Sequence, residues 1–248
     1  MNIKEYYSGL AEIWGDSAQC SMEDTYTRDK EVSEIIKAIT YHTGKGKESV
    51  LEIGCGNGYT AERVSNTLNI RMAAVDFCKD LVTIAKQRLC NVVFQEMDVT
   101  NLIFRNELFD IIYTERCLIN LPDWETQKRA LDEIYRVLKP GGVYIMLEAF
   151  TDGLDNLNGA RNAVGLPNIS QPEHNVFFVP ELVNGYARNK FDILVRDSFL
   201  SSYYFGSRVL YPALSKKIEY NNKFNEFFSE MCPVGNFSYI QMYVLRKL

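Results

Sequence analysis

Apolar residues along the first 150 positions alternate between two spacings. Between residues 28 and 42 they recur every three or four positions, which predicts an amphipathic helix, whereas residues 49–53 form a short apolar run that ends in glycines, as a buried parallel strand does. The same contrast then repeats. Further helices are expected at residues 61–68, 81–89 and 130–138, and further strands at residues 72–75, 92–94, 109–113 and 143–147. Strands that alternate with helices in this way predict an α/β fold, in which helices cover both faces of a parallel sheet.

The alternation lapses after residue 150. Residues 151–180 are rich in Asn, Gly and Pro and are expected to form a lid or insert, and residues 201–235 are dense in aromatic side chains. Residues 191–200 and 237–246 predict strands, the second of which closes the sheet. A single domain is the simplest account. Its predicted parts are a helical cap (1–46), a core (47–150), two inserts (151–190 and 201–236) and a closing strand (237–248).

The composition is that of an ordinary globular protein, with 46% hydrophobic and 24% charged residues. Lys and Arg number 27 against 32 Asp and Glu, and the basic residues cluster only in pairs such as Lys216–Lys217. A duplex nucleic acid is therefore a poor partner, because its binding requires a basic surplus. No apolar stretch approaches the ~20 residues that span a bilayer, and the first residues lack a signal-peptide apolar region. A cytoplasmic protein without a membrane span is expected.

The six cysteines do not form a recognisable metal site. No two of them have C-x-x-C spacing, and neither histidine lies at zinc-ligand spacing from a cysteine. Reduced, buried thiols are expected, with no bound metal. The oligomeric state stays open, with a homodimer as one option.

A glycine-rich turn is the strongest chemical signal in the chain. It spans residues 52–58, EIGCGNG, between the first expected strand and the following helix. Glycines let the backbone turn tightly and let a ligand approach where a Cβ would clash. Ligands of open α/β sheets bind at the carboxyl ends of strands, so this turn is the expected cradle.

Acidic residues follow the next two strands. Asp76 ends the second strand, 20 residues after Gly56, where a carboxylate suits the hydroxyls of a ribose. Phe77 beside it suits the face of a purine, and Asp98, after the third strand, suits an adenine amino group. A single strand-end carboxylate is more often a cap or turn residue, but here several occur in register.

The spacing of the turn disfavours a dinucleotide ligand. The dinucleotide fingerprint is G-x-G-x-x-G, with a pyrophosphate at a helix N-terminus. Here the pattern is G-x-G-x-G, and an acid, Glu52, stands two residues before it. A carboxylate at the cradle suits a ligand with a positive ammonium and sulfonium better than a pyrophosphate.

Taken together, these motifs resemble the class I S-adenosylmethionine-dependent methyltransferases. The resemblance runs from about Val50 to Glu148 and includes the turn, the strand-end acids, residues 109–113 and residues 138–142. It implies a Rossmann-like, doubly wound sheet of seven strands with an antiparallel last strand. It also implies S-adenosyl-L-methionine as the cofactor and S-adenosyl-L-homocysteine as the product.

The resemblance also implies roles for particular residues. It assigns the methionine end to Glu52, Gly54, Gly56 and Gly58, the ribose to Asp76, and the adenine to Phe77, Asp98 and Val99. The exit of the fourth strand, at Glu115, is where such enzymes bring donor and acceptor together. Residues 114–121 lack the Asn/Asp-Pro-Pro-aromatic motif of many enzymes that methylate amino groups of nucleobases or glutamine, which disfavours those acceptors.

The flanking segments resemble methyltransferases of bacterial surface-polysaccharide biosynthesis. The residues concerned are Trp14-Gly15-Asp16-Ser17, Met22, Asp24, Arg28, Asp152-Gly153-Leu154, Leu157-Asn158, Arg161, Gly165-Leu166 and His174-Asn175. This likeness implies a sugar, a nucleotide-activated sugar or a phosphorylated capsule precursor as the acceptor. It also motivates the hypothesis that Arg28 reaches the methionine carboxylate, with Trp14 on the lid.

Three residues are candidates for the transfer step, each with a plainer alternative. His174 is the preferred general base, because imidazole titrates near neutral pH; otherwise it is a solvated loop residue. Glu148, at the end of the fifth strand, orients an acceptor hydroxyl or satisfies backbone groups. Glu115 acts at the exit of the fourth strand or forms a structural ion pair with Arg116.

Arg161 and Arg208 are candidates to hold a phosphate or carboxylate of the acceptor, since guanidinium groups bind such anions through two parallel hydrogen bonds; exposed charge is the alternative. The aromatic stretch 203–212 is expected to wall the acceptor, to pack in the core or to contact a second subunit. We therefore expect O-methylation of a small or carbohydrate-linked acceptor. N-methylation of an amino sugar, and cofactor binding without catalysis, are the alternatives.

Overall fold

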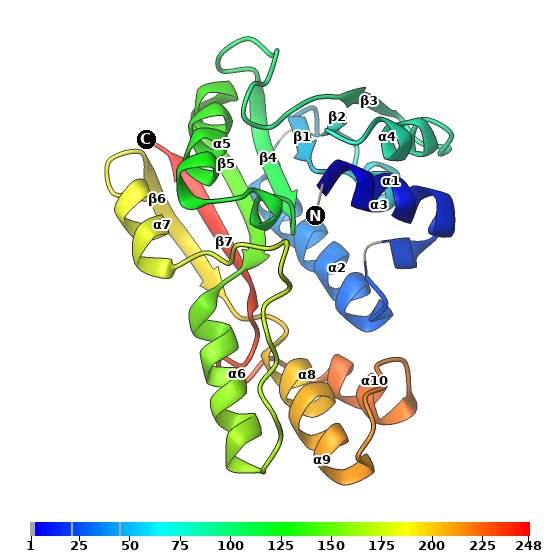
Figure 1. Cartoon of the computed structure of the whole chain (residues 1–248). Helices are drawn as coiled ribbons and strands as arrows, with labels where there is room; N and C mark the ends of the chain where they lie inside the picture. The colour runs from blue at the N-terminus through cyan, green and yellow to red at the C-terminus, as the bar shows by residue number, and fades with distance from the viewer. Residues whose placement is uncertain (1–2, 21, 45) are drawn as a thin grey trace.

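One sheet of seven strands forms the centre of the molecule, in the order β3-β2-β1-β4-β5-β7-β6 (Figure 1). The computed structural model describes residues 3–20, 22–44 and 46–248. The strands are β1 (Ser49–Ile53), β2 (Arg71–Asp76), β3 (Val92–Glu96), β4 (Phe109–Glu115), β5 (Leu138–Ala149), β6 (Phe191–Asp197) and β7 (Ile240–Lys247). Neighbours from β3 to β5 run parallel, whereas β7 runs antiparallel to β5 and β6. The predicted doubly wound sheet with an antiparallel last strand is confirmed.

Helices occupy the connections between the strands. They are α1 (Ile3–Trp14), α2 (Thr25–His42), α3 (Tyr59–Thr67), α4 (Lys79–Ala85), α5 (Trp124–Val137), α6 (Thr151–Ala163), α7 (Pro180–Ala187), α8 (Ser201–Phe205), α9 (Tyr211–Ser215) and α10 (Lys223–Glu230). Short helical turns are η1 (Ala18–Cys20), η2 (Leu118–Asn120) and the π-helical η3 (Gly206–Leu210). Strand order advances in opposite directions after β1 and after β4, so right-handed crossovers place α3 and α5 on opposite faces of the sheet.

Local chemistry explains where the predicted helices differ from the observed ones. Helix α2 begins three residues earlier than expected, because the side chain of Asp24 accepts a hydrogen bond from Thr27 N at 3.1 Å and caps the helix. Helix α4 ends at Ala85, and Leu89, which we had counted on its apolar face, is 90% exposed. The prediction of that longer helix was wrong.

The segment after β5 is a helix, where the sequence predicted only a lid or insert. Helix α6 buries Gly153, Leu157 and Arg161, which recur at helical spacing. The Asn and Gly content of the segment obscured this periodicity. In Figure 1, α6 lies beyond the carboxyl ends of the central strands, together with α8, α9 and α10.

The burial of the cysteines agrees only partly with the prediction. None of the six forms a disulfide, and Cys20, Cys55 and Cys78 are buried, whereas Cys232 is exposed. Among the described residues, no helix combines the length and apolarity that crossing a membrane requires. Within the same residues, no three His, Cys, Asp or Glu side chains are grouped so that they could hold a metal ion.

Two glycines of α6 provide a test of its packing. A Cβ at Gly153 would collide with the backbone carbonyl of Ser238, whereas a Cβ at Gly159 would meet nothing within 4 Å. We expect Gly153→Ala to lower the free energy of unfolding by about 1–3 kcal/mol through overpacking. Gly159→Ala should raise it by about 0.5–1 kcal/mol, because alanine favours the helix. Urea unfolding measures both, and equal shifts of the two variants would contradict this packing.

Candidate functional site

A cavity of about 420 Å³ lies at the carboxyl ends of β1, β2 and β4. We call it the glycine-turn cavity. Apart from Gly58, every residue predicted to bind the cofactor lines this cavity. These residues are Arg28, Glu52, Gly54, Gly56, Asp76, Phe77, Asp98, Val99 and Glu115. The fold thus gathers these side chains from β1, β2, β4, the segment after β3 and the cap helix α2.

Backbone geometry explains two of the glycines in the turn. Gly54 has a φ of +81°, and a Cβ there would collide with the side chain of Cys117. Its N–H donates to the carbonyl of Val75 at 2.8 Å, which ties the turn to β2. Gly58 has a φ of +77° and precedes α3, where a Cβ would press on Ala85 and Phe94. Contrary to our prediction, Gly58 does not line the cavity but allows the turn and the packing of α3.

Two strand-end carboxylates lie at the cavity. Asp76 accepts hydrogen bonds from the N–H groups of Gly56 and Cys78, each at 2.8 Å, and burial raises the pKa of Asp76. Asp98 is exposed, and one of its oxygens accepts both the N–H and the hydroxyl of Thr100 at 2.8 Å. Both carboxylates are therefore fixed in orientation by neighbouring residues.

Glu52 Oε2 and Arg28 Nε are buried at the cavity without a well-formed hydrogen bond to a described residue, although the Tyr113 hydroxyl interacts with the Glu52 carboxyl group. Burial, followed by the charge of Glu115, raises the pKa of Glu52 to about 8. Buried polar groups are normally satisfied, so these atoms favour a ligand that satisfies them. One acidic and one basic group match the ammonium and the carboxylate of a free amino acid. The cavity therefore fits the methionine end of S-adenosylmethionine.

Arg28 belongs to a buried network of charges that joins α2 to the end of β4. Its Nη1 donates to Glu115 Oε1 at 2.9 Å, and the Thr60 hydroxyl donates to Glu115 Oε2 at 2.6 Å. Arg116 Nε donates to Glu31 Oε1 at 2.9 Å, and Arg116 Nη2 lies 3.8 Å from Glu115 Oε1. The structural ion pair that was the alternative role for Glu115 is thus present, within a larger network.

The network determines how its members titrate. Burial acts to raise the pKa of Glu115, but the guanidinium groups of Arg28 and Arg116 outweigh it and lower that pKa. Burial raises the pKa of Glu31 to about 8. A carboxylate with a lowered pKa is a weak base, so the geometry favours a positioning role for Glu115 over proton transfer.

A second cavity, of about 460 Å³, adjoins the first, and we call it the aromatic cavity. Its aromatic lining consists of Tyr6, Tyr7, Trp14, Phe177 and Tyr239. Its polar lining consists of Gln19, Glu23, Arg116, Asn120, Ser170, His174 and Asn175. Four residues line both cavities: Tyr7, Cys20, Arg116 and Asn120. The two cavities therefore share a border made by α1, η1 and the segment after β4.

The predicted catalytic residues separate in the structure. His174 lines the aromatic cavity, with its ring centroid 4.9 Å from that of Tyr6. Glu148 lines neither cavity; its carboxylate is fully buried and accepts the backbone N–H groups of residues 117–119 at 3.0–3.3 Å. Burial raises the pKa of Glu148 to about 7. Its geometry corresponds to the plainer of its two predicted roles, in which it satisfies backbone groups and shapes η2.

The two arginines considered as anion holders bind within the protein instead. Arg161 donates to the carbonyls of Pro167, at 2.8 Å, and of Arg208. Arg208 donates to Asp24 Oδ2 at 2.6 Å and stacks over the ring of Tyr204 at 3.8 Å. Neither arginine lines either of these two cavities, and both are buried and bonded within the protein, so the structure favours a structural role over the predicted anion site and the exposed-charge alternative.

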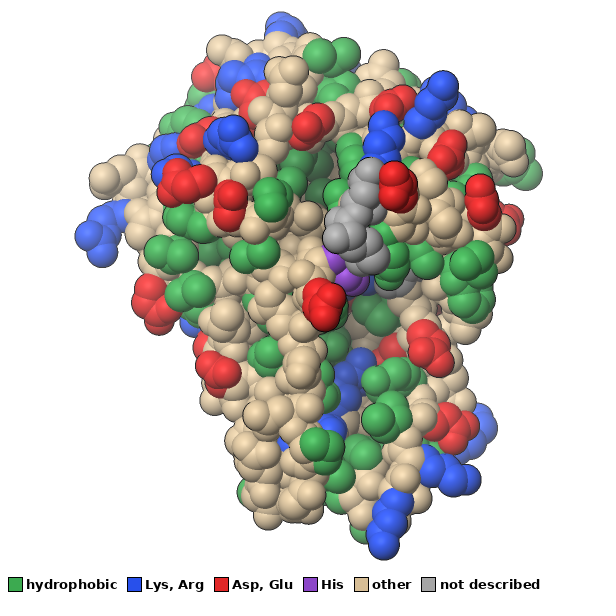
Figure 2. Space-filling view, viewed as in Figure 1, with side chains coloured by type: hydrophobic (Ala, Val, Ile, Leu, Met, Phe, Trp, Pro, Cys, Tyr) green, Lys and Arg blue, Asp and Glu red, His purple; other side chains and the backbone are tan. Residues whose placement is uncertain are grey.

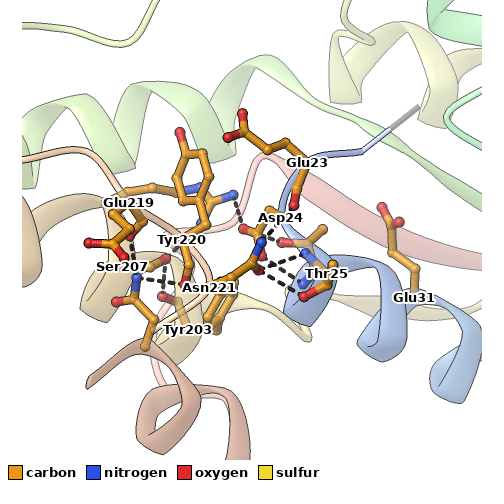
Figure 3. A network of polar contacts seen from close by, with 12 residues as sticks. Glu23, Asp24, Thr25, Glu31, Tyr203, Ser207, Glu219, Tyr220 and Asn221 are labelled. Atoms are coloured by element: carbon orange, nitrogen blue, oxygen red, sulfur yellow. Dashed lines mark hydrogen bonds and ion pairs between the residues drawn. The ribbon is translucent and has the colours of Figure 1, made fainter. Parts of the chain in front are cut away.

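Asp24, which is paired with Arg208, lies in a network that joins the cap to the C-terminal helices, and Figure 3 shows Asp24 with Thr25, Tyr203 and Asn221 around it. Asp24 is 2% exposed and also accepts a hydrogen bond from the Tyr203 hydroxyl at 2.6 Å. Burial acts to raise the pKa of Asp24, but the Arg208 guanidinium and the hydrogen bonds from Tyr203 and Thr27 together outweigh it and lower that pKa. Thr25 donates its N–H and hydroxyl to Asn221 Oδ1, at 3.1 and 2.8 Å. Figure 3 shows these groups facing one another across the start of α2 and the C-terminal helices.

Apart from Trp14, which was expected on the lid, the aromatic wall comes from residues that the sequence did not single out. In the stretch 203–212, Tyr203 and Tyr204 are 1% and 0% exposed and pack in the core, so the core-packing alternative holds for them. The sequence analysis did not identify Tyr7 as a cavity residue. Its position could have been predicted, because aromatic and apolar residues recur at helical spacing along α1. Asn120 had no signal, since a polar residue after a short turn is common.

Residues 50–142 match the sequence profile of the family described as "Methyltransferase domain". This segment is a methyltransferase domain. It is of the S-adenosylmethionine-dependent class, as the resemblance implied, and it contributes most of the residues that line the glycine-turn cavity. The capping helices and everything after residue 142 lie outside the matched segment.

A demethylmenaquinone methyltransferase of Leptospira interrogans is 35% identical over 111 residues, which are 42% of this chain and 43% of that protein. The chain therefore spans less than half the length of this curated relative. The solved structure of the [4+2]-cyclase SpnF is 17% identical, with a TM-score of 0.65, and covers 99% of this chain and 94% of its own. At that identity the likeness is one of fold.

A phosphoethanolamine N-methyltransferase from Haemonchus contortus, solved with phosphoethanolamine and S-adenosylhomocysteine, has a TM-score of 0.62 and 14% identity. The match covers 99% of this chain and 49% of that protein. It shows that the methyltransferase domain and its capping elements share one overall fold with that protein.

The unpaired oxygen of Glu52 generates a prediction for ligand binding. Glu52→Gln should weaken S-adenosylhomocysteine binding roughly 10- to 100-fold, because a charge-assisted hydrogen bond to the ligand ammonium is lost. With a pKa of about 8, Glu52 is mostly protonated at pH 7, so binding that requires the carboxylate should release nearly one proton. The wild type should therefore release about one proton more than the variant. Calorimetry in buffers of different ionisation enthalpy measures both quantities.

The matched control is Asp110→Asn. Asp110 lies at the start of β4, at the end of the strand opposite the cavity, and accepts hydrogen bonds from Ser49 and Lys139. The Asp110→Asn variant should bind S-adenosylhomocysteine with an affinity within about twofold of that of the wild type. Equal affinity and equal proton release in the wild type and Glu52→Gln would exclude Glu52 from the ligand site.

Proposed function

We propose that this chain is a methyltransferase that O-methylates a small or carbohydrate-linked acceptor. The observation that carries the proposal is the shared border of the two cavities at Tyr7, Cys20, Arg116 and Asn120. S-adenosylmethionine supplies an electrophilic methyl group on a sulfonium centre when bound. Two adjoining cavities meet the main requirement of such an in-line transfer, which is that donor and acceptor are held in contact and water is excluded.

In this proposal the glycine-turn cavity holds the donor. Glu52 and Arg28 bind the two ends of the amino acid moiety, and their buried, unpaired atoms support this assignment. Asp76 binds the ribose, and Phe77, Asp98 and Val99 bind the adenine; their places in the cavity lining agree with these roles. Glu115 holds Arg28 in position.

The aromatic cavity holds the acceptor. The apolar faces of sugar rings pack well on aromatic side chains, and Tyr6, Trp14 and Tyr239 supply such faces. Polar side chains of the lining, among them the amides of Gln19 and Asn175, can form hydrogen bonds with sugar hydroxyls. This mixture of aromatic and neutral polar side chains supports a carbohydrate better than a long apolar chain.

His174 is the proposed general base. It is the histidine of the aromatic cavity, and the next residue, Asn175, reaches the border through its bond to Asn120 at 2.9 Å. As the acceptor oxygen forms its bond to the methyl carbon, the carbon–sulfur bond of the sulfonium would break and leave neutral S-adenosylhomocysteine, and the hydroxyl proton would pass to the His174 imidazole. Release of that proton to solvent then restores the neutral base.

Charge in the aromatic cavity limits the acceptor further. Its acidic and basic lining residues are Glu23 and Arg116, and Arg116 is paired with Glu31 and lies near Glu115. Without a surplus of positive charge, the wall favours a neutral acceptor, and any phosphate of an activated precursor would lie outside the cavity. Acidic and basic side chains also intermingle on the face shown in Figure 2, which lacks the broad basic surface of a nucleic-acid binder.

The same charge balance supports a second candidate, N-methylation of an amino sugar. Glu23 in the wall would attract an amine, and an uncharged amine needs no strong base to react. The acceptors named for the relatives, a quinone and phosphoethanolamine, belong to proteins matched mainly in their donor halves or in fold alone. A shared fold does not decide the reaction, as the cyclase among the neighbours illustrates.

The proposal is tested with methyl-labelled S-adenosylmethionine, the purified protein and an extract of the source cells that retains both small molecules and macromolecules. Mass spectrometry should find the label on a neutral sugar, a sugar-linked precursor or an amino sugar. His174→Asn should slow transfer to a hydroxyl about 100-fold or more. Label on protein or nucleic acid, or no transfer despite measurable cofactor binding, would contradict the proposal.

Blocking the aromatic cavity separates acceptor binding from donor binding. Leu154, on α6, lines that cavity alone, so Leu154→Trp should abolish transfer while S-adenosylhomocysteine still binds. Leu182→Trp, on α7 and outside both cavities, is the control and should keep its activity. Full activity of Leu154→Trp would place the acceptor elsewhere.

A further inference from the structure

A single amide side chain occupies the border between the two cavities. Asn120 Oδ1 accepts hydrogen bonds from the Tyr7 hydroxyl, at 3.0 Å, and from Asn175 Nδ2, at 2.9 Å. Its Nδ2 donates to the carbonyls of Arg116 and Cys117, at 2.9 and 3.2 Å. An amide group has two acceptor positions and two donor hydrogens, so all four are used.

The segments that meet at Asn120 come from separate parts of the chain. Tyr7 lies on α1, which contributes to the glycine-turn cavity, and Asn175 lies on the loop 164–179, which walls the aromatic cavity. Val176 reinforces the second contact, since its N–H donates to the carbonyl of Ile119 at 2.7 Å. No residue of this loop lines the glycine-turn cavity in the part of the chain that the structure describes.

The chemistry of the three groups indicates positioning rather than proton transfer. Burial raises the pKa of Tyr7, so its phenol stays protonated and remains a donor at neutral pH. The amide of Asn120 does not titrate. Because Nδ2 is anchored by two backbone carbonyls, the amide cannot turn over, and Oδ1 keeps facing both donors.

We propose, resting on the proposed function, that Asn120 is a positioning residue that couples the donor and acceptor cavities. A donor ligand that fixes α1 also holds the Tyr7 hydroxyl against Asn120 Oδ1. Because Asn120 Oδ1 also accepts a hydrogen bond from Asn175, it then orients Asn175 and the loop 164–179. The loop therefore takes its final shape after the donor is bound. Binding is ordered, with the donor first, and an occupied aromatic cavity slows donor release in return.

Hydrogen exchange with S-adenosylhomocysteine as the probe tests this coupling without a known acceptor. In the wild type, the ligand should slow exchange of the amides of residues 169–177 roughly fivefold, the effect of one additional neutral hydrogen bond. In Tyr7→Phe the ligand should leave the exchange of this loop unchanged. Tyr41→Phe is the matched control, because Tyr41 lies on α2, is 85% exposed and lines neither cavity, and it should respond as the wild type does.

A second variant tests the acceptor side of the same amide. Asn175→Ala should lose the response of the loop while the amides of α1 are still protected by the ligand. A response in Tyr7→Phe or in Asn175→Ala equal to that of the wild type would overturn the coupling, as would a wild-type loop indifferent to the bound ligand. Calorimetry separates the two proposals: no binding of S-adenosylhomocysteine refutes the proposed function, whereas binding without a loop response refutes only the role of Asn120.

Discussion

The site depends on the ion pair between Arg28 of α2 and Glu115 at the end of β4. The side chains of Arg28 and Glu115 are 9% and 3% exposed, and Arg28 Nη1 lies 2.9 Å from Glu115 Oε1. Leaving either charge buried and unpaired would cost on the order of 3–5 kcal/mol, so α2 must lie across the carboxyl ends of the central strands. That placement brings the cap to the cradle formed by the glycine turn, and it completes the wall of the glycine-turn cavity.

The rest of the cap follows from this contact. Asp24, at the start of α2, accepts hydrogen bonds from the C-terminal helices through Tyr203 and Arg208, so the position of α2 also fixes the helices beyond the sheet. The chain before α2 then lies over the border, where Tyr7 reaches Asn120. Residues 50–142 therefore supply most of the glycine-turn cavity, while the segments outside them supply most of the wall of the aromatic cavity.

The sequence predicted the parts of the fold that depend on local pattern. Short apolar runs that are followed by glycine or end in aspartate, such as residues 49–53, identified the strands. They also indicated the end of the sheet where a ligand is expected, because the carboxyl ends of parallel strands meet there. Helix α6 was missed because its buried positions are separated by Asn and Gly. Hydrogen bonds between distant segments leave no periodic pattern in a sequence. For this reason the sequence did not reveal the internal bonds of Arg161 and Arg208, or the contacts of Asn120.

A crystal structure with S-adenosylhomocysteine bound tests the central claim, that the glycine-turn cavity holds the donor with its reactive end at the shared border. The account predicts the amino acid moiety between Glu52 and Arg28, the ribose at Asp76, and the sulfur facing Tyr7 and Asn120. A ligand bound in the aromatic cavity, or bound in the glycine-turn cavity with its sulfur away from that border, would contradict it.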